Sequence, residues 1–222
     1  MSIIRLLTKI VDYRQKENTA DKNVRGIKKV QIMDLRVKKT KSSIINAFLT
    51  LRSKKPLERI TVTELSSAAQ INKATFYLHY KDIYDLSETL ENELFENVFD
   101  SIEHPDAVLT DSKLFVRELV NGFVSNQSLI DIIFSDGRRG VLADRLEKKL
   151  KNLLFEMYPQ YKGIPEVDAL LTYMIKGGYY AFTENMTRGC DINRLVTVIS
   201  DAAEYVAKSV IAAGESGSEA AR

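Results

Sequence analysis

The segment QINKATFYLHYK, residues 70–81, concentrates side chains that can donate hydrogen bonds to an anion. Its twelve residues include three aromatic residues, one histidine, two lysines and a threonine. Hydroxyl, imidazole and ammonium groups are common donors to the phosphate oxygens of DNA, and such contacts make up most of the hydrogen bonds in a protein–DNA interface. The segment therefore favours a surface that contacts a polyanion.

Patterns typical of catalytic and metal centres do not occur in the sequence. His79 and His104 are its two histidines and Cys190 is its single cysteine. None of them has partners at the spacing of a nucleophile–base pair or a metal site, and there is no glycine-rich phosphate loop. We therefore expect no enzymatic activity, no cofactor and no bound metal.

Composition places the chain among globular proteins of a reducing compartment. It has 222 residues, of which 45% are hydrophobic and 28% are charged. A single cysteine cannot form an intramolecular disulfide. No stretch of the sequence is apolar and long enough to span a bilayer. We expect a cytoplasmic protein that does not interact with membranes.

Short helices must position the segment 70–81. An apolar stripe predicts a first helix from about Lys38 to Arg52, consisting of Ile44, Ile45, Phe48 and Leu51. Thr61 and Glu64 have the spacing of a capping box, which predicts a second helix over about 62–69. Asn72 is a good N-cap for a third helix over about 73–79, and a longer fourth helix follows from about Asp82.

A second and third helix joined by such a tight turn indicate a helix-turn-helix, in which the second helix of the pair enters the DNA major groove. Phe76 and Tyr80 are expected to pack inward. Tyr77 lies about 100° further round the helix than Phe76, so we expect its hydroxyl to reach the DNA.

Residues 61–86, TVTELSSAAQINKATFYLHYKDIYDL, resemble the TetR family of bacterial transcriptional regulators. The match covers roughly residues 36–100. It implies an all-α fold, with an N-terminal helix-turn-helix domain followed by a helical domain for ligand binding and dimerisation. The resemblance also implies a homodimeric repressor that binds a palindromic operator in double-stranded DNA and is released by a small-molecule effector.

The resemblance assigns roles to individual residues. Phosphate contacts would come from Thr61, Thr75, Tyr77, His79 and Lys81, and base-edge contacts from Thr63, Lys73, Ala74 and Leu78. Two positions depart from the family pattern. Gln70 stands at a turn position usually held by glycine, where a positive φ would cost about 1 kcal/mol. Ile83 stands where a basic residue is common, so this phosphate contact would be either lost or left to the backbone amide at the start of that helix.

These departures leave a second interpretation open. The chain could be a helical ligand-binding or protein-interaction module whose degenerate helix-turn-helix no longer binds DNA. Dependence of DNA affinity on salt distinguishes the two, since phosphate contacts release counterions.

The remainder of the sequence predicts five further helices, near residues 111–123, 128–134, 140–158, 165–186 and 191–214. An effector pocket is implied by the family, and its candidate lining residues are aromatic: Phe115, Phe123, Phe134, Phe155, Tyr158, Tyr173 and Tyr180. The last two helices carry a wide apolar surface. That surface is either an ordinary intrachain core or, as the resemblance implies, a four-helix dimer interface.

Charge divides the chain unevenly. Residues 1–41 hold twelve Lys and Arg against four acids, whereas the rest holds 20 bases against 26 acids. A basic front indicates either a polyanion partner or a solvated tail. We expect an extension over 1–34 that is disordered or precedes a true start at Met33, a helix-turn-helix domain over 35–81, a regulatory and dimerisation domain over 82–213, and a disordered tail over 214–222.

Overall fold

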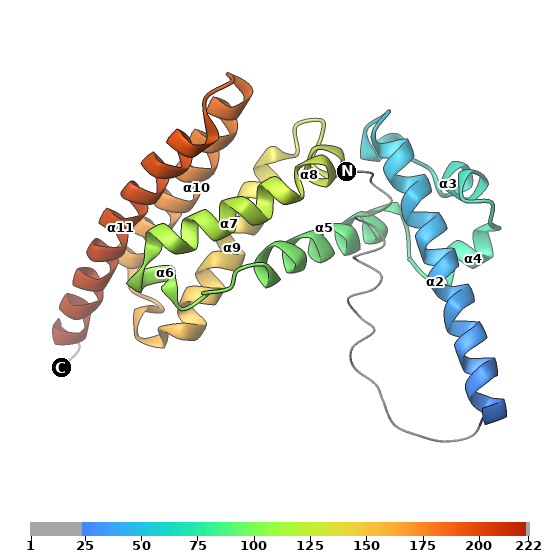
Figure 1. The fold of residues 1–222 in the computed structure, drawn as a ribbon, viewed down its shortest axis with the longest axis horizontal. Coiled ribbons are helices and arrows are strands. Elements are labelled where there is room, and N and C mark those ends of the chain that lie inside the picture. The colour runs from blue at the N-terminus through green and yellow to red at the C-terminus, as the bar shows by residue number, and fades with distance from the viewer. Residues whose placement is uncertain (1–23, 221–222) are drawn as a thin grey trace. The chain divides into compact units, whose positions relative to one another are not determined.

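The computed structural model describes the backbone of residues 24–220 and the side chains of residues 35–215 (Figure 1). Every regular element in this part of the chain is helical, which confirms the all-α prediction. The chain forms two compact units, which divide between Glu93 and Leu94. The boundary lies within a helix rather than at its start, where the sequence had suggested it.

The first unit contains α2 (Val24–Arg52), a 3-10 turn η2 (Leu57–Arg59), α3 (Val62–Ala68), α4 (Lys73–Tyr77) and the first part of α5 (Ile83–Asp100). Helices α3 and α4 agree with the prediction. Helix α2 begins fourteen residues before the expected Lys38. Residues 24–37 contain no proline, and their long basic and aliphatic side chains tolerate a helix, so their polarity is not evidence of disorder. The rest of the expected extension, 1–23, lies outside the described residues.

The core of the first unit contains most of the apolar stripe that predicted its first helix. Ile44, Ile45 and Phe48 are buried, whereas Leu51 is only partly buried. Phe76 also belongs to this core and is completely inaccessible. Truncating a fully buried phenylalanine to alanine costs about 3–5 kcal/mol. This core therefore fixes the orientation of the very short helix α4, which could not be stable in isolation.

Side-chain caps define where α3 and α4 begin. Thr61 Oγ1 accepts a hydrogen bond from the backbone N–H of Glu64 at 3.3 Å, which is one half of the expected capping box. The reciprocal half does not form, because the Glu64 carboxylate pairs with the ammonium of Lys55 instead. Asn72 Oδ1 accepts from the Thr75 N–H at 2.7 Å, as its N-cap assignment requires.

The turn between α3 and α4 is closed by a residue in the left-handed region. Gln70 has a φ of 57°. Its N–H donates to the Ser67 carbonyl at 3.1 Å, and the Ile71 N–H donates to the Ser66 carbonyl at 2.9 Å. This pair of bonds is a Schellman motif, which usually has glycine where Gln70 stands.

The second unit begins with the rest of α5 and continues through α6 (Ala107–Thr110), α7 (Ser112–Ser125), α8 (Gln127–Ile133) and α9 (Arg139–Met157). It ends with η3 (Pro159–Tyr161), α10 (Pro165–Thr187) and α11 (Ile192–Ala220), and the last two helices lie side by side (Figure 1). The five expected helices are present within a few residues, and the one-turn helix α6 was not predicted. The tail expected from residue 214 is wrong in part, because α11 continues to Ala220.

Ion pairs connect neighbouring helices of the second unit. Lys113 Nζ on α7 reaches the carboxylates of Asp201 and Glu204 on α11, at 2.8 and 3.0 Å. Between α9 and α10, the Glu147 carboxylate accepts from the Thr172 hydroxyl at 2.6 Å, and it also pairs with Lys151 Nζ of its own helix at 2.8 Å. These two donors, with Lys151 the larger influence, lower the pKa of Glu147 to about 2.

Helix α11 packs against η3 through a glycine. A Cβ atom on Gly214 would lie 2.1 Å from Cε1 of the buried Tyr161 ring, far inside contact distance. The aromatic ring therefore occupies the volume that any other side chain at position 214 would need.

Candidate functional site

The outer face of α4 presents the residues expected to contact DNA. The side chains of Lys73, Ala74, Tyr77 and Leu78 are exposed, and Leu78 is 82% accessible. A single exposed leucine is common on protein surfaces, so Leu78 is informative only as part of this face. The face combines one cation, one phenol and two apolar groups, which suits a mixture of phosphate and base-edge contacts.

Tyr77 is held in place by the core beneath it. Its ring meets the Phe76 ring edge to face, at 5.5 Å between centroids and 82° between planes. Phe76 and Tyr80 are buried while Tyr77 is 56% exposed, as the sequence predicted. The Tyr77 ring thus packs against Phe76 on one side and is open to solvent on the other.

The threonines differ in their freedom to bind phosphate. Thr61 and Thr63 are exposed, and Thr61 keeps its hydroxyl proton because it acts only as acceptor in its cap. Thr75 instead donates its proton to Asn72 Oδ1 at 2.8 Å. A phosphate contact from Thr75 would therefore compete with the cap of α4.

His79 is half-buried beside the exposed Lys41. Burial lowers the pKa of His79, and the nearby Lys41 ammonium lowers it further. At neutral pH the imidazole is therefore uncharged and can offer one N–H to a phosphate oxygen rather than an ion pair.

Carboxylates accept hydrogen bonds from two backbone amides near the start of α5. Ile83 is buried. The N–H of Lys81 donates to Asp85 Oδ2 and the N–H of Asp85 donates to Asp82 Oδ1, both at 2.8 Å. These two amides are therefore already paired, which favours loss of the phosphate contact over its replacement by the backbone. The exposed Lys81 side chain remains as a donor.

Basic residues of α2 extend the cationic surface of this unit. Arg36, Lys39 and Lys41 are exposed and Lys38 is partly exposed. The sequence predicted a basic arm here, and the structure makes that arm a continuation of a helix.

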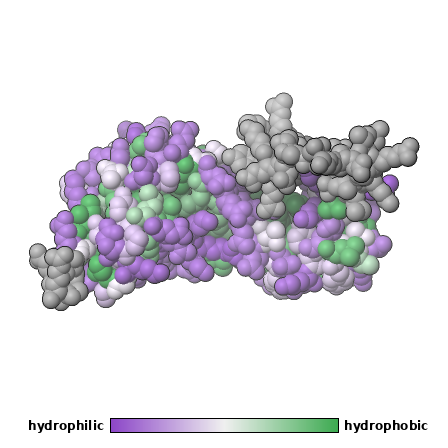
Figure 2. Space-filling view, turned by 90° about the horizontal axis from the view of Figure 1, so that it is seen from below, coloured by the Kyte–Doolittle hydropathy of each residue, from purple (hydrophilic) through white to green (hydrophobic). Residues whose placement is uncertain are grey.

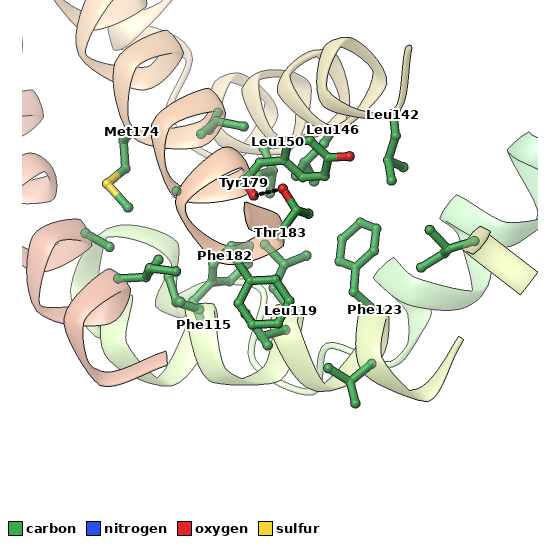
Figure 3. A pocket seen from close by; sticks show the side chains of 18 of the residues that line it. Phe115, Leu119, Phe123, Leu142, Leu146, Leu150, Met174, Tyr179, Phe182 and Thr183 are labelled. Atoms are coloured by element: carbon green, nitrogen blue, oxygen red, sulfur yellow. Dashed lines mark hydrogen bonds between the residues drawn. The ribbon is translucent and has the colours of Figure 1, made fainter. Parts of the chain in front are cut away.

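The second unit encloses an apolar cavity of about 920 Å³ (Figure 3). In Figure 3, Phe115, Leu119 and Phe123 enter it from α7, whereas Leu142, Leu146 and Leu150 enter from α9, and Met174, Tyr179, Phe182 and Thr183 come from α10. This volume falls within the range of small-molecule sites, which are mostly apolar clefts of about 300–1,000 Å³.

Three of the seven aromatic residues proposed for the pocket line this cavity: Phe115, Phe123 and Phe134. The assignment was wrong for the other four. Phe155 and Tyr158 pack against the core cluster that contains Tyr161 and Val167, without lining the cavity themselves.

Tyr173 and Tyr180 point away from the cavity and are 75% and 41% exposed. The neighbouring Tyr179 lines it instead, since one residue turns the helix by about 100°. The sequence could have indicated that Tyr179 faces inward, because the apolar residues Leu171, Met174 and Ile175 share one face of the helix with it.

Hydrophobic residues also remain on the surface of α10 and α11. Tyr173 is exposed on α10, and Val198 and Tyr205 are 67% and 75% exposed on α11. The view in Figure 2 likewise shows hydrophobic residues gathered between hydrophilic ones over the larger unit. The intrachain core takes other residues of α11, namely Ile199, Ala203, Ala207 and Val210.

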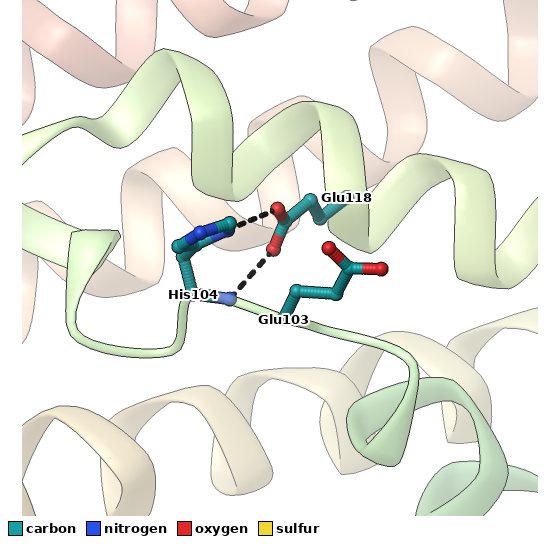
Figure 4. A group of neighbouring side chains, drawn as sticks. All are labelled: Glu103, His104 and Glu118. Atoms are coloured by element: carbon teal, nitrogen blue, oxygen red, sulfur yellow. Dashed lines mark hydrogen bonds and ion pairs between the residues drawn. The ribbon is translucent and has the colours of Figure 1, made fainter.

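Glu103, His104 and Glu118 form a group with ligand-type atoms close together (Figure 4). His104 Nδ1 lies 2.7 Å from Glu118 Oε1, and the backbone N–H of His104 donates to Glu118 Oε2 at 3.0 Å. The pKa of His104 is raised, mainly by its hydrogen bond to Glu118. The sequence did not reveal this pair because fourteen residues separate its members. The His104–Glu118 pair joins the loop that follows α5 to helix α7, as an ordinary ion pair does.

Comparison with models of known protein families gives no match to this chain, and comparison with curated proteins gives no similar sequence. None of the described helices has the length and apolar character needed to cross a membrane. The geometry of the two units therefore carries the functional argument.

Proposed function

We propose that this chain is a sequence-specific DNA-binding regulator of transcription that acts in the cytoplasm as a homodimeric repressor. The observation that carries the proposal is the outer face of α4. Lys73, Tyr77 and Leu78 stand exposed on a helix held by buried aromatic residues, in a unit whose front is strongly basic. This is what a TetR-type helix-turn-helix requires, as the sequence resemblance implies.

The residues of this face would have two roles: contacts to phosphates would position the helix, and contacts to bases would give sequence specificity. Tyr77 and His79 would donate to phosphates, which fixes the register on the duplex without reading sequence. Lys73 would donate to guanine O6 or N7, and Leu78 or Ala74 would contact a thymine methyl group.

Homodimer formation accounts for the exposed side chains of α10 and α11. Two half-sites about 34–36 Å apart are read by two copies of one helix-turn-helix. A twofold axis would place Val198 and Tyr205 against the same residues of a second copy. Val198→Glu should shift the protein from dimer to monomer in sedimentation velocity, whereas Lys148→Glu on the exposed face of α9 should not.

Regulation would come from the cavity in the second unit. A ligand that favours one arrangement of α5 would change the separation of the two recognition helices. Because both half-sites need one fixed separation, DNA contacts would be lost at both together.

Selection of bound sequences from random duplex DNA by the full chain tests the proposal. A palindromic motif is expected. Tyr77→Ala should weaken binding to all sequences, and Lys73→Ala should relax preference at one position. Tyr84→Ala is the matched control, because Tyr84 is 57% exposed in the same unit and lies outside the proposed face.

A second candidate function is supported by the cavity alone. If selection yields no motif and any DNA affinity is purely salt-driven, the chain is a helical ligand-binding module with a degenerate helix-turn-helix. Gln70 and the buried Ile83 favour that alternative.

A further inference from the structure

The cavity of the second unit is long rather than round. On α10 its lining runs from Leu171 to Thr187, a span of sixteen residues and therefore about 24 Å. On α7 it runs from Ser112 to Val124, nearly the whole helix. A volume of about 920 Å³ spread over that length gives a channel about 7 Å across. This width accommodates a hydrocarbon chain or a flat ring system.

One end of the channel is closed and apolar. Leu109, Leu154, Leu171, Ala207 and Val210 line it, and the same five residues belong to one buried core cluster. They come from α6, the end of α9, the beginning of α10 and the second half of α11. The side chains of these five residues cannot hydrogen-bond a polar ligand group, so a polar group placed among them would lose its hydration without compensation from them.

The opposite end is polar. Gln127, Asp131 and Arg139 line it and are all exposed, and Gln127 Nε2 donates to Asp131 Oδ1 at 2.8 Å. This end therefore offers amide, carboxylate and guanidinium groups to a ligand while remaining in contact with water.

The polar atoms along the middle of the channel are already satisfied. The Tyr179 hydroxyl donates to the Arg139 carbonyl at 3.1 Å, and the Thr183 hydroxyl donates to the Tyr179 carbonyl at 2.9 Å. What they present to the cavity is an aromatic ring and a methyl group. The middle of the channel thus selects for apolar length rather than for hydrogen-bonding groups.

We propose that this channel binds an elongated, largely hydrocarbon molecule with a single polar end. The tail lies toward Leu154 and Val210, and the polar end lies at Gln127 and Arg139. Its role as an effector rests on the proposed function, whereas binding itself does not depend on DNA.

Titration calorimetry of the full chain with straight-chain carboxylic acids and primary alcohols tests this inference. Below the micellar range, each added methylene should tighten Kd about three- to fourfold until the chain fills the channel, after which Kd should level off. A Kd that is insensitive to chain length, or no binding by either series, overturns the inference.

Filling variants locate the tail. Ala207→Phe at the closed end should lower the chain length at which Kd levels off, and Leu146→Trp in the middle should weaken binding of long chains at least tenfold. Val141→Trp is the matched control on α9, because Val141 is exposed and does not line the channel. An equal response to chain length in all three variants would show binding elsewhere and refute the proposal.

Ala203→Leu is a smaller filling variant in case the larger ones do not fold. It should weaken binding of long chains relative to wild type while circular dichroism stays unchanged. DNA selection separates this inference from the proposed function. A chain that selects a palindrome but ignores hydrocarbon chains refutes only the ligand class, and one that binds them without selecting DNA refutes only the regulator.

Discussion

Replacing Gln70 with glycine should stabilise the first unit. Gln70 has a φ of 57°, in a region that costs a non-glycine residue about 1–2 kcal/mol. Glycine removes that cost but loses about 0.5–1 kcal/mol of entropy on folding. The midpoints of these ranges give a net gain of about 0.75 kcal/mol, which corresponds to a rise in Tm of roughly 3–6 °C for a unit of this size.

The assay is thermal unfolding of the full chain, combined with hydrogen exchange of the amides in α3 and α4. Exchange isolates the first unit, because local protection reports its own opening free energy. Gln70→Ala should change little, since alanine has the same conflict with a positive φ. Gln70→Val should destabilise, because a β-branched residue tolerates this region least.

Ser67→Gly is the matched control. Ser67 is exposed within α3, where glycine should cost about 0.5–1 kcal/mol. If Gln70→Gly destabilises the unit as Ser67→Gly does, position 70 is not in the left-handed region and the argument for the turn fails.

Three further perturbations test other features. Glu147→Gln should destabilise the chain by about 1–2 kcal/mol at pH 7, allowing for solvent screening. Because the pKa of Glu147 in the folded chain is about 2, the stabilisation from its carboxylate is present above pH 4.5 and is lost as pH falls from 4.5 toward 2. Chemical denaturation at several pH values measures this loss. DNA affinity should rise as pH falls through the lowered pKa of His79, since protonation adds a cation at the phosphates, and His79→Gln should remove that rise in a fluorescence anisotropy titration. Gly214→Ala should cost about 1–3 kcal/mol through its clash with Tyr161, measured by thermal unfolding.

Each of these perturbations has an outcome that contradicts it. A Glu147→Gln variant with unchanged acid sensitivity would show that the pair with Lys151 contributes nothing. A pH response that survives in His79→Gln would assign it to another group. Gly140→Ala is the control for Gly214→Ala, because its nearest contact for a Cβ is an ordinary 3.9 Å. Equal effects of the two alanines would refute the close packing of Tyr161.

The helices and their inward faces were predictable because burial imposes a period on the sequence. Ile44 and Phe48 fall at helical spacing, and Asn72 is an N-cap as its residue type suggested. Apolar spacing and N-cap residues are local features, so each can be recognised within a single helix turn of sequence.

Features that depend on distant residues could not be read from the chain. The partner of Glu64 is Lys55 rather than the amide of Thr61, which only the packing of η2 beside α3 decides. The choice of Tyr179 over Tyr180 depends on the rotation of α10 about its axis. A difference of one residue turns the side chain by about 100° around the helix, and apolar periods fix that rotation only approximately.

The boundaries of helices were the other source of error. Val24 opens α2 and Ala220 closes α11, each within a stretch that looked too polar to be ordered. Polar residues disfavour burial, but they do not prevent a helix that continues from a packed segment, since elongation adds one hydrogen bond for each residue fixed.

The close fit between Gly214 and Tyr161 restricts how the second unit can move. Sliding α11 along its axis by about one turn in one direction would bring Val210 to the ring, where its side chain would overlap it. Shear of α11 past η3 in that direction is therefore disfavoured. If the unit transmits the proposed ligand signal, rotation or bending of helices would leave this contact intact, whereas a register shift of α11 that brings Val210 to the ring would not.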